Sequence, residues 1–182
     1  MNINVAQSGQ DYIFKHLIDE ERACVLSKLK QLERALMGLH YEGKIFSFNH
    51  IKKIEDIVSS LRKKYQQHAN LDEKVVYPFL EKHIPRISPT LNFLEMECQQ
   101  FQGLFEAFDK VLSELKEKNR IFLRNNIIEQ LKNKGIYLIC LVKSHIQLEE
   151  EIVYKAIFQE LHKNERGFLQ KEIEIFTKNN RK

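Results

Sequence analysis

Apolar residues recur every three or four positions along most of the chain, which is the spacing of an amphipathic helix. Four stretches keep this rhythm over several turns: Ile18, Arg22, Val25, Leu29, Leu32 and Leu36; then Ile54, Val58, Leu61, Tyr65, His68, Asp72, Val75 and Phe79; then Leu91, Leu94, Cys98, Phe101, Phe105, Phe108 and Leu112; and finally Leu138, Val142, His145, Glu149, Ile152 and Ala156. The pattern therefore predicts four long helices, each with one face in a core.

Glycine, proline and polar residues mark where these helices are expected to begin and end. Gly38 is predicted to stop the first helix, and Ser88 to cap a third helix that opens at the proline after it. Residues 42–49 and 116–126 are predicted to be connections, and Gly135 to mark the start of the fourth helix. Short connections place successive helices side by side.

Four long helices with short connections favour an antiparallel up-and-down four-helix bundle, so the predicted fold class is all-α. We expect residues 1–10 to form an N-terminal arm, residues 11–163 the bundle, and residues 164–182 a C-terminal amphipathic extension. After Gly167, the alternation of Glu and Ile fits a short terminal helix, and it would also suit a strand.

Composition agrees with one all-helical domain. The 182 residues are 43% hydrophobic and 30% charged, with only six Gly and three Pro. The net charge of +4 comes from interspersed signs and no nucleic-acid-reading motif accompanies it, so we expect no nucleic-acid partner. The chain shows neither a secretory signal nor an apolar run long enough for a bilayer, and its three cysteines are too few and too far apart for a disulfide framework. These features predict a cytoplasmic protein with no membrane partner.

Two histidine–acid pairs interrupt the apolar stripes of the second and fourth helices. His68 precedes Asp72 by four residues, and His145 precedes Glu149 by the same distance. Side chains at this spacing lie one above the other on a helix face. In an up-and-down bundle the two pairs, together with Cys98 of the third helix, would share one layer. Two imidazoles and two carboxylates suit iron, manganese or zinc.

The pieces "HANLDEKVVYPFLEKH" and "HIQLEEEIVYKAIFQEL" resemble the two halves of the hemerythrin-like, or HHE cation-binding, family, in which His is followed four residues later by an acid and then by an apolar run. The resemblance covers about residues 11–163 and implies a four-helix bundle with a non-haem di-iron or related metal site. It places His68, Asp72, His145 and Glu149 on ligand positions. Glu73 follows Asp72 and Glu150 follows Glu149, and either of these acids could serve as a ligand instead.

The chain departs from the family pattern at the two remaining histidine ligands. Cys98 occupies the position expected in the third helix, and Arg22, or Glu21 if the alignment moves by one residue, the position in the first. An ionised Cys98 would favour zinc, and Glu21 could ligate as a carboxylate, so both are candidate extra ligands. Arg22 cannot ligate, but it could pair with a carboxylate of the layer and replace the charge of a metal.

The sequence leaves three functional interpretations open. In the first, the bundle binds one or two non-haem iron ions, or zinc, and senses, stores or carries iron, oxygen or nitric oxide without catalytic turnover; its partners are the metal and a small diatomic molecule. In the second, the bundle is metal-free and serves as a structural or protein-interaction module, with Arg22 as the discriminating residue. The third, a metal-dependent enzyme that repairs damaged iron centres, rests on the family resemblance alone.

Overall fold

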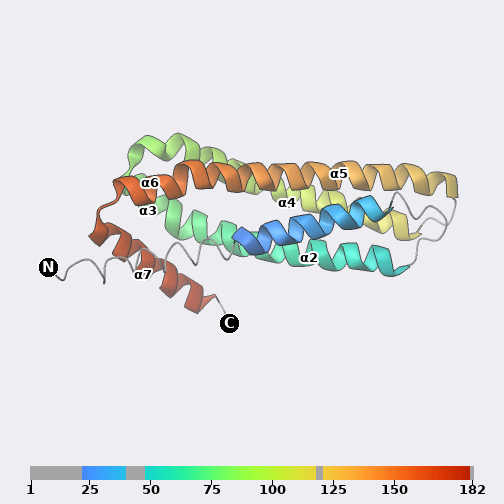
Figure 1. Cartoon of the computed structure of the whole chain (residues 1–182), viewed down its shortest axis with the longest axis horizontal. Helices are drawn as coiled ribbons and strands as arrows, with labels where there is room; N and C mark the ends of the chain where they lie inside the picture. The colour runs from blue at the N-terminus through green and yellow to red at the C-terminus, as the bar shows by residue number, and fades with distance from the viewer. Residues whose placement is uncertain (1–21, 40–47, 118–120, 181–182) are drawn as a thin grey trace. The chain divides into compact units, whose positions relative to one another are not determined.

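The structure, a computed structural model, describes residues 22–39, 48–117 and 121–180, and these residues are almost entirely helical (Figure 1). The helices are α2 (Phe48–Leu71), α3 (Tyr77–His83), α4 (Ser88–Glu117), α5 (Ile121–Leu148), α6 (Lys155–Glu160) and α7 (Lys163–Asn179), together with the helical residues 22–39. The described residues contain no strand, which confirms the predicted all-α class. None of these helices combines the length and the apolar character needed to cross a membrane.

Two helices widen into π-helical segments before they continue. The first π segment, Asp72–Val76, joins α2 to α3, and the second π segment, Glu149–Tyr154, joins α5 to α6. Right-handed helical angles persist on both sides of each segment, so the chain stays helical through them. In a π turn the hydrogen bonds span five residues instead of four, and such turns are rare and frequently occur at functional sites. Each segment begins at the acid of a predicted histidine–acid pair.

The π segments move the buried face by one residue relative to the predicted stripes. The prediction placed Val75, Phe79 and Ile152 in the core, but these side chains are only partly buried. The structure buries the following residue in each case: Val76, Leu80 and Val153. Buried positions thus recur every four residues, whereas an α-helix overshoots a full turn by about 40° at each such step. The wider π turn absorbs this excess rotation.

The predicted breaks at Gly38 and Gly135 are wrong. The first helix contains Gly38 and is described as far as residue 39, while α5 begins at Ile121 and passes through Gly135. Most of the predicted connection 116–126 is therefore helical, and so are residues 48 and 49 of the predicted connection 42–49; residues 118–120 and 42–47 lie outside the described part. Glycine weakens a helix by only about 1 kcal/mol, which packing readily offsets.

The C-terminal extension forms α7, a helix of 17 residues that begins before Gly167. At its start the backbone N–H of His162 donates to Oε2 of Glu165 at 2.6 Å, half of a capping box. Leu169 and Ile173 are buried, which is helical spacing, so the strand alternative is wrong.

The packing divides the chain into two compact units, and each is described by itself. Among the described residues, the first unit contains 22–24, 66–95 and 146–180. Its core includes the following buried residues: Val76, Tyr77, Leu80, Ile84, Ile87, Leu91, Leu94, Val153, Ala156, Ile157, Leu161, Leu169 and Ile173. Helix α7 contributes the last two and contacts the first π segment. The extension is thus part of this core.

The second unit contains residues 25–65 and 96–145. Within it, Glu55 of α2 forms an ion pair with Lys116 of α4, and Arg62 of α2 forms one with Asp109 of α4. Residue numbers rise along α2 as they fall along α4, so the two helices are antiparallel. Helix 22–39 likewise meets α5 through the ion pair of Glu33 with Lys143 and the approach of Leu36 to Gly135. Figure 1 shows these helices lying alongside one another.

Candidate metal centre

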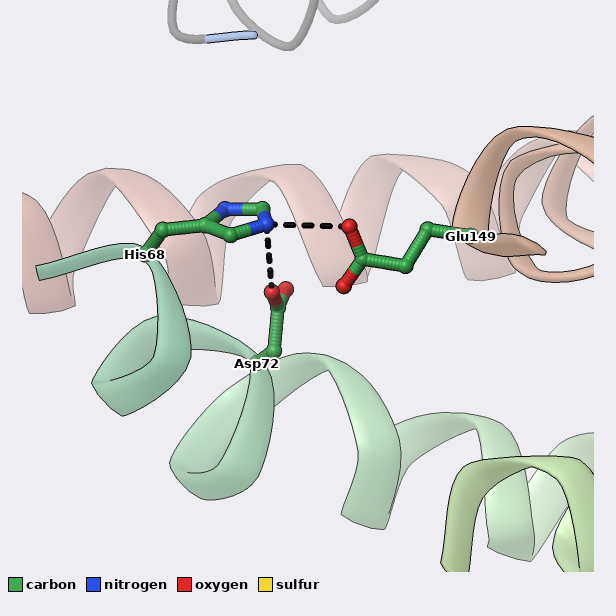
Figure 2. Close-up of side chains that lie close together, drawn as sticks. All are labelled: His68, Asp72 and Glu149. Atoms are coloured by element: carbon green, nitrogen blue, oxygen red, sulfur yellow. Dashed lines mark hydrogen bonds and ion pairs between the residues drawn. The ribbon is translucent and has the colours of Figure 1, made fainter. Parts of the chain in front are cut away.

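Three side chains of the first unit converge on one point. His68 comes from the end of α2, Asp72 from the start of the first π segment, and Glu149 from the start of the second. Nε2 of His68 lies 3.2 Å from Oδ2 of Asp72 and 3.0 Å from Oε2 of Glu149. Figure 2 shows both carboxylates pointing toward this nitrogen. One ligand atom from each residue lies within 4.8 Å of the others, close enough for all three to hold one metal ion.

Burial makes this convergence chemically informative. Asp72 and Glu149 are 3% and 2% exposed, and the His68 side chain is 16% exposed. Taking a carboxylate out of water costs several kcal/mol unless a cation or hydrogen bonds compensate. Nε2 of His68 lies within 3.2 Å of an oxygen of each carboxylate. A metal cation would neutralise both, so the donor set fits a metal ion.

Tyr77 forms a hydrogen bond with the second carboxylate oxygen of Glu149. Its hydroxyl group donates to Oε1 of Glu149 at 3.0 Å, and Tyr77 itself is 5% exposed at the start of α3. Glu149 therefore presents Oε2 toward His68 while Oε1 is occupied. The sequence analysis did not assign Tyr77 a role, although it stands at the end of the apolar run "VVYP" that follows Asp72.

The neighbouring acids lie in different surroundings from the three clustered residues. Burial, together with the negative charge of Glu95, raises the pKa of Glu73, and Lys74 partly opposes this shift. Glu150 has a half-exposed side chain and forms an ion pair with Arg22, whose Nη1 lies 2.7 Å from its Oε2. The interpretation in which Arg22 neutralises Asp72 or Glu149 stays a prediction.

Two further predicted ligands, Cys98 and His145, belong to the second unit. There, Nδ1 of His145 lies 2.9 Å from Oε2 of Glu97, and Nε2 lies 3.9 Å from Sγ of Cys98. The oxygen of Tyr65 lies 3.3 Å from the same sulfur. The metal-ligand roles of Cys98 and His145 stay predictions, and Glu21 lies outside the described residues.

The contacts of the Glu97 carboxylate and of the Tyr65 hydroxyl were not predicted from the sequence. Glu97 is 8% exposed, and its position three residues after Leu94 and four before Phe101 places it in the predicted apolar stripe. A charged residue at such a position, next to Cys98, is the signal that could have identified it.

One comparison with known proteins identifies a family. The model of the hemerythrin HHE cation binding domain matches residues 14–157, a range that includes His68, Asp72 and Glu149. No curated protein and no solved structure matches the chain. The match covers well over half of the 182 residues.

Proposed function

This chain belongs to the hemerythrin HHE cation-binding domain family, and we propose that it binds a metal ion through His68, Asp72 and Glu149. The observation that carries the proposal is the convergence of their ligand atoms within 4.8 Å in a buried part of the first unit. Burying two carboxylates this close together costs more free energy than exposing them on the surface, and a bound cation would offset that cost.

The donor set favours non-haem iron in this proposal. One imidazole and two carboxylates, without a thiolate among the three, suit iron and manganese better than a soft metal, and zinc remains chemically compatible. Two carboxylates could also bridge a pair of ions, as they do in other helical carboxylate proteins, so we propose one or two ions per chain. Iron held by three protein ligands would supply open positions for a small molecule such as oxygen or nitric oxide.

The chain's own residues would orient and protect that ion. Tyr77 holds Glu149 by its Oε1, and the low exposure of Asp72 and Glu149 keeps bulk water away. Nothing in this arrangement supplies a nucleophile. We therefore propose sensing, storage or carriage of iron or a diatomic gas, in a cytoplasmic protein whose long helices form an antiparallel up-and-down bundle.

Metal content of purified protein tests the proposal directly. The chain would be loaded with ferrous iron without oxygen, desalted, and assayed for iron per chain. We expect about one or two ions in the parent and a loss of at least about 100-fold in affinity in His68→Ala and Glu149→Gln, more than loss of a supporting contact costs. Glu150→Gln, which changes the half-exposed acid next to Glu149, is the matched control and should retain the metal.

The same assay separates the metal-free interpretation. If the folded parent binds neither iron nor zinc, the metal proposal is wrong and a structural or interaction module becomes the better account. Arg22 pairs with Glu150, which is the residue after Glu149 in the sequence. In that case Arg22→His should gain metal binding that the parent lacks.

A further inference from the structure

A second cluster of polar side chains lies buried in the second unit and is contributed by three helices. Tyr65 comes from α2, Glu97 and Cys98 from α4, and His145 from α5. Their exposed fractions are 4%, 8%, 9% and 1%, respectively. Buried polar groups are normally retained only where they satisfy one another.

The contacts in this cluster link Glu97, His145, Cys98 and Tyr65 in that order. The Glu97 carboxylate can only accept, so Nδ1 of His145 carries the hydrogen of their 2.9 Å contact. Nε2 then presents its lone pair toward Cys98, whose sulfur lies 3.9 Å away. The Tyr65 hydroxyl lies 3.3 Å from that sulfur and can donate to it. A thiol, a base and an orienting carboxylate thus follow one another.

Aromatic rings hold the imidazole in place. The ring centroids of Phe101 and Tyr65 lie 5.5 Å and 5.9 Å from that of His145, both in edge-on orientation. The imidazole is thus held with Nε2 toward the sulfur of Cys98, where it can accept the thiol proton.

We propose that Cys98 is a peroxide-reactive thiol, with His145 as its base and Glu97 as the positioning residue. His145 takes the thiol proton at Nε2. The thiolate attacks one oxygen of a hydroperoxide: the S–O bond forms, the O–O bond breaks, and the leaving oxygen takes the proton back from His145. With hydrogen peroxide the products are Cys98 sulfenic acid and water, so the sulfur loses two electrons and the peroxide gains them.

The other two cysteines provide an internal reference. Cys140 is exposed and Cys24 is partly buried, whereas Cys98 is buried. If accessibility alone decided reactivity, Cys140 would react first. The proposal predicts the opposite order, because reaction requires the thiolate more than it requires exposure to so small an oxidant. It does not depend on the metal site in the first unit.

Two single-thiol proteins test this order in metal-free, chelator-treated protein. The Cys24→Ser/Cys140→Ser variant keeps only Cys98, and the Cys24→Ser/Cys98→Ser variant keeps only Cys140. Each would be treated with hydrogen peroxide in the presence of dimedone, which traps sulfenic acid, and the adduct followed by intact mass. We expect Cys98 to react at least about tenfold faster than Cys140 at pH 7. An equal or slower reaction of Cys98 overturns the proposal.

Variants of the neighbours test the assigned roles. In the Cys98-only protein, His145→Gln should remove the rate advantage. Glu97→Gln should shift the pH profile of the reaction toward higher pH, and Glu97→Asp should restore it in part, which a purely structural role would not do. An unchanged rate in His145→Gln contradicts the proposal. Should that variant fail to fold by circular dichroism, an unchanged pH profile in folded Glu97→Gln contradicts it instead.

The metal assay separates this role from ligation. Cys98→Ser in the otherwise native chain should bind as much iron or zinc as the parent. If the substitution removes metal, Cys98 is a ligand and the thiol assignment is wrong, while the proposed metal function survives.

Discussion

The Tyr77 hydroxyl donates to one oxygen of the Glu149 carboxylate at 3.0 Å, while the other oxygen of that carboxylate lies 3.0 Å from Nε2 of His68. Both oxygens are therefore engaged by residues of the first unit. This fixes the orientation of Glu149 before any metal arrives, which reduces the ordering cost of binding.

Removing the Tyr77 hydroxyl should weaken metal binding without removing a ligand. We expect Tyr77→Phe to lower iron affinity by about 10- to 100-fold, as loss of a supporting hydrogen bond to a ligand typically does, and to cost about 1 kcal/mol of unfolding free energy. Competition with a coloured chelator measures the affinity. Tyr137→Phe, at a position 53% exposed, is the control and should change neither quantity.

Gly135 is needed for close packing and not to end a helix. A Cβ atom at this position would clash with Cδ1 of Leu36 and lie 3.1 Å from a ring carbon of Phe108. Gly135→Ala should therefore destabilise the protein by about 1 to 3 kcal/mol despite the better helix propensity of alanine. Gly103→Ala, whose Cβ would meet nothing within 4 Å, should instead stabilise it by about 0.5 to 1 kcal/mol. Denaturant unfolding of both variants measures these changes in the free energy of unfolding. The prediction is wrong if both variants are stabilised or both are destabilised.

The C-terminal helix should be required for the stability of the first unit. Leu169 is fully buried in its core, so Leu169→Ala should cost about 2 to 5 kcal/mol. Phe168→Ala removes a larger side chain from the same helix, but that side chain is 62% exposed, and the loss should stay within about 0.5 kcal/mol. Thermal unfolding distinguishes the two; equal shifts would mean that α7 does not belong to the core.

Glu73 should make stability depend on pH. Burial first, and then the charge of Glu95, raises the pKa of Glu73, so the folded protein keeps this proton to higher pH than the unfolded chain. The contribution of Glu73 to the free energy of unfolding therefore falls as pH rises above its ordinary pKa of about 4.3.

We expect Glu73→Gln to stabilise metal-free protein modestly at pH 7, and the gain to vanish below about pH 4, where the parent's Glu73 is protonated in both states. Urea unfolding across this range is the measurement. Glu106→Gln, at an exposed position of α4, is the control for replacing a glutamate by glutamine. A gain that persists at low pH would refute the electrostatic cause.

Apolar spacing and the His-x-x-x-acid pattern are local, so the sequence predicted the helical stretches and the spacing of the two pairs, but it placed the start of the fourth long helix at Gly135 instead of Ile121. It did not reveal the π segments, since "DEKVVYP" and "EEEIVY" offer apolar residues for either helical register. Val75 and Val76 are chemically the same, and only tertiary packing selects the second.

The grouping of the polar residues also depended on tertiary structure. His68, Asp72 and Glu149 come from two distant stretches and meet in the first unit. The contacts of His145 with Glu97 and Cys98 depend instead on the rotation of α4 against α5. Spacing within one helix fixes which residues share a face, but not which face of a neighbour they meet.

The two π segments place the candidate ligands at the least regular turns of their helices. Because a π turn is less favourable than an α turn, these turns should open to solvent more readily than the flanking helix, and opening either one would carry an acid away from His68. A bound ion would add its binding free energy to the closed state, about 2.7 kcal/mol at a concentration 100 times its dissociation constant. Metal binding would therefore slow amide hydrogen exchange in the two π segments.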